Sequence, residues 1–82
     1  MMKIYGSMMC PDCVACCREL EAAGIAFEFC DFADAMENLK AFLKIRDTDP
    51  MFDEVRAAGK VGIPCIVCDD AGILLDWKVL LK

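Results

Sequence analysis

The sequence predicts an α/β domain in which helices flank a four-stranded mixed sheet. Two β-prone runs, at residues 3–6 and 25–31, enclose a segment with helical spacing, and a helical crossover of this kind joins parallel strands. Two later runs, at residues 65–68 and 73–75, are joined by the turn-forming residues 69–72, which is typical of an antiparallel hairpin. Parallel and antiparallel pairs in one chain indicate a mixed sheet.

The helices follow from proline, glycine and the spacing of apolar residues. Pro11 suits the first turn of a helix, where its missing N–H has no partner to lose, and Gly24 is a suitable stop. Residues 49–59 predict a short helix, and residues 76–82 allow at most a short C-terminal one. Before them, a helix of about three turns is expected to bury one apolar face, formed by Ala35, Met36, Leu39, Phe42 and Leu43.

Composition excludes several classes of function. The 82 residues support a single domain over 1–82. The net charge is −5 and no basic stripe is visible, so nucleic acid is not an expected partner. No apolar run approaches the ~20 residues of a membrane span, and the first residues lack the apolar stretch of a secretion signal. We therefore expect a cytoplasmic protein without a membrane partner. Because the chain has no histidine, any nucleophile must be activated without an imidazole.

Seven cysteines are the most informative residues, and four of them fall within residues 10–17. Cys10 and Cys13 form a C-x-x-C pair where a strand passes into a helix. Free N–H groups and the positive end of the helix dipole favour a thiolate at Cys10, and Cys13, one turn further on, can attack a mixed disulfide formed there. The same pair is also half of a zinc site. Pro11 within the motif and the strand before it favour redox chemistry.

A second element is the proline that precedes the third predicted strand. Pro64 cannot donate to a sheet ladder, so it is either an ordinary edge proline or part of a cis Ile63–Pro64 turn. Proline chemistry leaves both alternatives open. In the second, the backbone of Ile63 can pair with an extended substrate strand beside the cysteines.

The chain resembles a glutaredoxin, within the thioredoxin-like superfamily. The resemblance covers almost the whole chain and is carried, in order, by Ile4-Tyr5, Cys10-Pro11-Asp12-Cys13, Gly62-Ile63-Pro64, Ile66-Val67 and Asp69. It implies a thioredoxin-like (glutaredoxin) fold with a short C-terminal helix. It also implies a cis proline facing the cysteines, a nucleophilic Cys10 and a resolving Cys13.

Three departures from the glutaredoxin pattern affect the expected site. Asp12 stands where tyrosine is typical, and its carboxylate opposes thiolate formation at Cys10. Ser7 stands where many members carry lysine. Residues 73–77 replace the glycine pair and aspartate that hold glutathione in most members. Lys60 is either a cation that supports a thiolate or an anionic substrate, or a solvated loop charge.

The sequence therefore predicts a thiol-disulfide oxidoreductase with Cys10 and Cys13 as catalytic residues. The expected substrate is a protein or small molecule with a disulfide, and glutathione or a thioredoxin-type reductase is the expected electron donor. No bound cofactor or metal is assigned. The residues expected to contact substrate are Pro11, Asp12, Lys60, Ile63 and Pro64.

Two other interpretations remain open. In the first, a thiolate site for zinc, copper or an iron–sulfur cluster uses Cys10, Cys13, Cys16 and Cys17. In the second, the chain is a non-catalytic partner-binding domain. Core filling is the expected role of Cys17, Cys30 and Cys68, whereas Cys65 could approach the Cys10 region.

Overall fold

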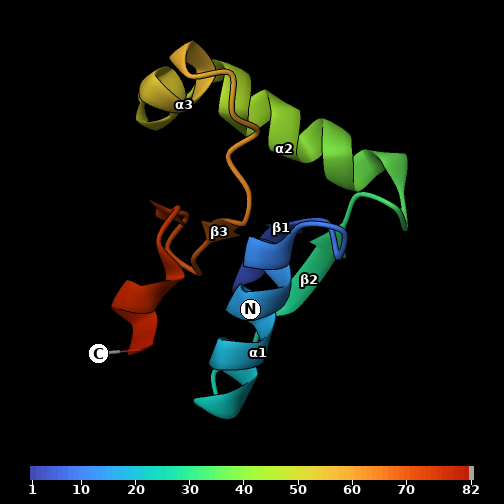
Figure 1. Ribbon diagram of the computed structural model, residues 1–82, viewed down its shortest axis with the longest axis vertical. Coiled ribbons are helices and arrows are strands. Elements are labelled where there is room, and N and C mark those ends of the chain that lie inside the picture. Colours follow the sequence, from blue (N-terminus) through green and yellow to red (C-terminus); the bar gives the residue numbers. More distant parts are fainter. Residues whose placement is uncertain (82) are drawn as a thin grey trace.

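A computed structural model describes residues 1–81 and contains one four-stranded sheet with the strand order β2-β1-β3-β4 (Figure 1). The strands are β1 (Lys3–Gly6), β2 (Glu28–Asp31), β3 (Cys65–Val67) and β4 (Ile73–Leu74). β1 is parallel to β2 and antiparallel to β3, and β3 is antiparallel to β4. The predicted mixed sheet is confirmed, although residues 25–27 precede β2 rather than belong to it.

Three α-helices and two 3-10 turns complete the described chain. The α-helices are α1 (Pro11–Ala22), α2 (Met36–Thr48) and α3 (Asp53–Ala57). The segment predicted as one short helix is a 3-10 turn, η1 (Pro50–Phe52), followed by α3. The C-terminal element is the 3-10 turn η2 (Trp77–Leu81). None of the helices in residues 1–81 has both the length and the apolar character that crossing a membrane requires.

Glycine and aspartate set the ends of these helices. Gly24 follows α1 with φ +74°, a left-handed conformation that glycine adopts without a steric penalty, so the predicted stop is confirmed. Asp49 begins η1, and its Oδ1 accepts a hydrogen bond of 2.9 Å from the Met51 N–H.

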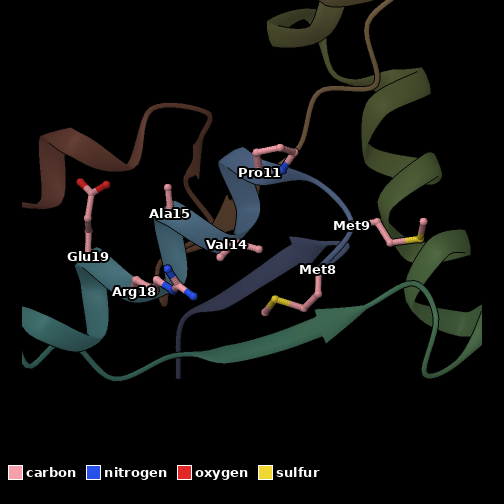
Figure 2. Close-up of a pocket in the computed structure, with 7 residues that line it drawn as sticks. All are labelled: Met8, Met9, Pro11, Val14, Ala15, Arg18 and Glu19. Atoms are coloured by element: carbon pink, nitrogen blue, oxygen red, sulfur yellow. The ribbon is translucent and has the colours of Figure 1, made fainter.

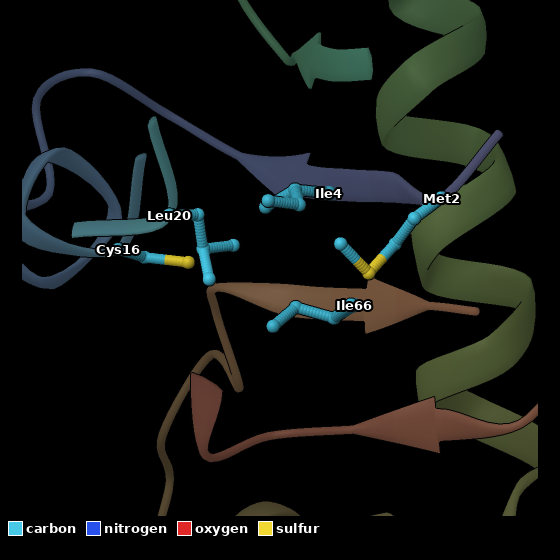
Figure 3. Close-up of a cluster of buried hydrophobic side chains, with 5 residues drawn as sticks. All are labelled: Met2, Ile4, Cys16, Leu20 and Ile66. Carbon is cyan, nitrogen blue, oxygen red and sulfur yellow. The ribbon is translucent and has the colours of Figure 1, made fainter. Parts of the chain in front are cut away.

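The two faces of the sheet are covered by different helices (Figure 1). Alternate residues of a strand point to opposite faces, so Ile4 and Tyr5 of β1 belong to different clusters. On one face, side chains from α1 and the sheet form the buried cluster of Figure 3, which consists of Met2, Ile4, Cys16, Leu20 and Ile66. On the other face, α2 and η1 bury an aromatic cluster with Cys65 of β3, formed by Phe42 and Phe52. Each fully buried large side chain contributes about 1.5–3 kcal/mol.

The predicted buried face of α2 is partly wrong. Met36 is 60% exposed and Leu43 is 37% exposed, whereas Phe42 is fully buried. Leu39 and Ile45 are half-buried. The face of α2 that is directed toward the sheet therefore consists of Leu39, Phe42 and Ile45, which are three residues apart. Leu43 is one residue, and therefore about 100° around the helix, from Phe42. An apolar side chain next to the buried one is thus directed toward solvent.

Candidate active site at the start of helix α1

The turn between β1 and α1 places Cys10 at the N-cap of the helix. The Cys10 N–H donates to the Ser7 carbonyl at 3.0 Å, and the Met9 N–H donates to Ser7 Oγ at 3.1 Å. Cys10 has an extended backbone (φ −93°, ψ 119°), and its carbonyl accepts the first helical hydrogen bond from Val14 at 3.2 Å. The Cys10 side chain does not cap the helix and is half-buried. Its sulfur is therefore held at the helix end without being used by the helix.

Free backbone donors surround this helix end. Pro11 occupies the first helical position and has no N–H to satisfy. Within residues 1–81, the N–H groups of Asp12 and Cys13 have no hydrogen-bond acceptor. These donors and the positive end of the helix dipole favour a negative charge on the Cys10 sulfur. The exposed carboxylate of Asp12, in the same turn, disfavours a negative charge on the Cys10 sulfur by charge repulsion.

Cys13 lies directly beneath this position, in contact with β1. It is fully buried, and a Cβ added to Gly6 would lie 2.6 Å from Cys13 Sγ. Burial, together with a hydrogen bond and charge repulsion from Cys10, raises the pKa of the Cys13 thiol to about 12, against a backbone hydrogen bond from Ser7 that lowers it. The interactions with Cys10 place the two predicted catalytic sulfurs side by side.

A groove of about 650 Å³ opens at Cys10 and brings together three of the predicted substrate-binding residues. Lys60, Ile63 and Pro64 line it, and the Ile63–Pro64 peptide bond is cis, so one of the two alternatives for this proline is confirmed. Several further residues that the sequence did not predict as substrate-binding also line the groove, namely Val55, Gly59, Val61, Gly62 and Leu75. They come from α3, from the loop after it and from the position directly after β4, and no local motif connects these segments with Cys10.

Pro11 and Asp12 do not line this groove. Pro11 lines a second hollow of about 580 Å³ on the outer side of α1 (Figure 2). Met8 and Met9, from the turn before the helix, form one end of this hollow, and Met9 is 93% exposed. The rest of its lining consists of Val14, Ala15, Arg18 and Glu19 on α1. Asp12 lines neither the groove nor this hollow.

The other cysteines of α1 are directed elsewhere. Cys16 packs against Ile4, Leu20 and Ile66 in the core between α1 and the sheet (Figure 3), and burial raises its pKa to about 12. Cys17 is also buried. Across residues 1–81, no three cysteine, aspartate or glutamate side chains are grouped so that they could hold a metal ion.

Of the remaining three cysteines, Cys30 lies in β2, Cys65 lies in β3 and Cys68 directly follows β3. Cys30 is buried, as expected for a core residue. Cys65 is buried with Phe42 and Phe52 on the face covered by α2, and its approach to Cys10 stays a prediction. Cys68 is half-buried and packs at the edge of the α1-side cluster, so its expected core position is correct only in part.

Comparison with known proteins gives one informative relative. No family model matches the chain, and no solved structure matches it. An uncharacterized protein of Haemophilus influenzae is 31% identical over 77 residues, which cover 94% of this chain and 90% of that protein. At this identity and coverage, the chain belongs to the same family as the Haemophilus protein.

Proposed function

We propose that the protein is a thiol-disulfide oxidoreductase with a thioredoxin-like, glutaredoxin-related fold. The observation that carries the proposal is the pairing of a half-buried Cys10 at a helix N-cap with a buried Cys13 beneath it, at the edge of a groove lined by Ile63 and Pro64. The β-α-β crossover followed by an antiparallel hairpin supports the proposed fold relationship.

The first step is attack by the Cys10 thiolate on one sulfur of a substrate disulfide. A mixed disulfide forms between Cys10 and that sulfur, the substrate S–S bond breaks, and the second substrate sulfur leaves as a thiolate that takes a proton from water. The free N–H groups of Asp12 and Cys13 stabilise the negative charge on Cys10 before the attack.

The second step is attack by the Cys13 thiolate on the Cys10 sulfur. The mixed disulfide breaks, a Cys10–Cys13 disulfide forms, and the remaining substrate sulfur leaves as a thiol after protonation. Two electrons have then passed from the dithiol to the substrate. A thiol donor of the glutathione or thioredoxin-reductase class supplies two electrons and two protons to restore Cys10 and Cys13.

The environment of Cys13 couples these two steps. Once Cys10 is bonded to substrate, it no longer carries a charge, so its contribution to the raised pKa of Cys13 disappears. Burial, the largest cause of the shift, persists. Resolution therefore accelerates as the pH rises, because more Cys13 is ionised.

The groove offers backbone and apolar contacts to the substrate. Within residues 1–81, neither the N–H nor the C=O of Ile63 is hydrogen-bonded, so both are free to pair with an extended chain. Val61 and Leu75 supply apolar walls, and Lys60 supplies a cation at the rim. These contacts favour a polypeptide disulfide as substrate.

The experiment is a coupled reduction assay with a disulfide-bonded peptide and, separately, with bis(2-hydroxyethyl) disulfide. Replacing the nucleophile, in Cys10→Ser, is expected to reduce the rate to the uncatalysed background. Cys13→Ser is expected to accumulate the mixed disulfide, detected by mass spectrometry. Cys68→Ser is the matched control, because Cys68 is also half-buried but lies away from the groove. Full activity in Cys10→Ser would show that the proposed function is wrong.

A further inference from the structure

The loop that forms the rim of the groove is held by one arginine of α2. Arg46 Nε donates to the Val61 carbonyl at 2.9 Å, and Arg46 Nη2 donates to the Lys60 carbonyl at 2.7 Å. The planar guanidinium thus binds two successive carbonyls, a geometry that the single ammonium of lysine does not reproduce. The Arg46 side chain is 23% exposed, and both hydrogen bonds lie at the surface of the protein.

The loop is also fixed from beneath. The Lys60 N–H donates to the Val55 carbonyl at 3.0 Å. Gly62 has φ +92°, and a Cβ added there would lie 2.9 Å from the ring of the buried Phe52. The backbone at Gly62 therefore rests directly on the aromatic core. Arg46 holds the outer part of the same loop, just before Ile63.

A second arginine fixes the position of Arg46 itself. Arg56 of α3 donates to the Arg46 carbonyl, and it donates to the Asp49 carbonyl at 3.3 Å. The other end of its guanidinium pairs with Asp53. A continuous series of hydrogen bonds therefore runs from α3 through the end of α2 to the rim of the groove at Lys60.

We propose that Arg46 is a positioning residue, which holds the Lys60–Val61 rim so that the Ile63 backbone is in register with a substrate sulfur bonded to Cys10. This inference rests on the proposed function. Arg46 is absent from the lining of the groove and acts through the two carbonyls. Its loss is expected to weaken substrate binding while Cys10, on a different element, keeps its reactivity.

The kinetic test compares Arg46→Ala, Arg46→Lys and Lys44→Ala in the full chain with a disulfide-bonded peptide as substrate. Lys44 is the matched control, because it is an exposed cation on the same helix whose side chain forms no hydrogen bond or ion pair within residues 1–81. Arg46→Ala is expected to raise KM about tenfold with kcat within about twofold. Arg46→Lys, which retains one donor group, should have a KM between those of Arg46→Ala and the wild type. Lys44→Ala should have the KM of the wild type.

Two further measurements separate positioning from a general effect on the fold. The alkylation rate of Cys10 by iodoacetamide should be unchanged in Arg46→Ala. Amide hydrogen exchange in Arg46→Lys should accelerate at Lys60, whose N–H is hydrogen-bonded to the Val55 carbonyl, and remain unchanged in α1. A wild-type KM in Arg46→Ala, or unaltered exchange at the Lys60 amide, would overturn the inference. A wild type that reduces no disulfide would instead overturn the proposed function, and the exchange comparison would still decide whether Arg46 holds the rim.

Discussion

The N-terminal end of α1 and the middle of the helix both carry a cysteine, but one cysteine is partly exposed and the other is fully buried. Cys10 is half-buried beside unpaired backbone N–H groups, whereas Cys16 is fully buried against the sheet, where burial raises its pKa to about 12. Both are free thiols, one at the N-cap of α1 and one within the helix. From this difference we expect that the position of a cysteine relative to the helix end, and its burial, decide whether its sulfur can react.

The largest expected effect is a difference in alkylation rate. In the native reduced protein, iodoacetamide should modify Cys10 at least about 100-fold faster than the buried cysteines, because it requires an accessible thiolate. Cys68 gives the sharper comparison. It is also half-buried, but burial and the charges of Asp70 and Asp69 raise its pKa, so it should react more slowly than Cys10. Peptide mapping by mass spectrometry after timed quenching measures each rate, and equal rates for Cys10 and Cys68 would contradict the electrostatic explanation.

Alkaline pH should destabilise the fold by several kcal/mol, because it acts on the buried group of thiols. The pKa of Cys13, Cys16 and Cys65 rises from an ordinary 9.0 to about 12 in the folded state. These thiols ionise first in the unfolded chain, so stability is constant below about pH 8 and falls as the pH passes 9. The slope approaches about 1.4 kcal/mol per pH unit for each buried thiol.

Urea unfolding between pH 7 and 10.5, with reductant present, measures this loss. Cys16→Ala removes one of the three strongly shifted thiols, so its stability should fall less steeply with pH than that of the wild type. Stability that stays constant up to pH 10.5 would show that these thiols are hydrated in the folded protein.

Local sequence signals predicted the parts of the molecule that depend on neighbouring residues. The strand before Cys10, the proline at the first helical position and the stop at Gly24 each follow from interactions within a few residues. The C-x-x-C pair was correctly placed for the same reason, because three residues along a helix bring two side chains to one end.

Contacts between distant segments could not be predicted in this way. In the sequence, Arg46 has no feature that distinguishes it from a solvated charge near the end of a helix. In the structure it binds the carbonyls of Lys60 and Val61, which are 14 and 15 residues further along the chain. Leu75 reaches the groove because β4 pairs with β3, which lies beside β1. The exposure of Leu43 likewise depends on which side of α2 faces Phe52. Such facts are set by packing across the sheet and have no local pattern.

A smaller effect on stability is expected when serine replaces the buried Cys16 and, separately, the half-buried Cys10. Cys16→Ser places a hydroxyl in an apolar cluster and should cost about 1–3 kcal/mol of unfolding free energy. Cys10→Ser, at a half-buried position, should change it by less than about 0.5 kcal/mol. Cys16→Ala separates the effect of the hydroxyl from loss of the sulfur. Equal losses in both serine variants, measured by urea denaturation, would contradict the contrast.

The smallest expected effect concerns the charge that opposes the helix end. Asp12 is exposed in the first turn of α1, so replacing its carboxylate by an amide in Asp12→Asn should favour the Cys10 thiolate. Surface charges at helix ends are worth about 0.3–1 kcal/mol, which corresponds to an increase of about two- to fivefold in the alkylation rate of Cys10. Salt screens such charges, so the increase should largely disappear at 1 M ionic strength, while the rate at Cys68 should not change. An increase that persists at high salt would show that Asp12 acts by its shape rather than by its charge.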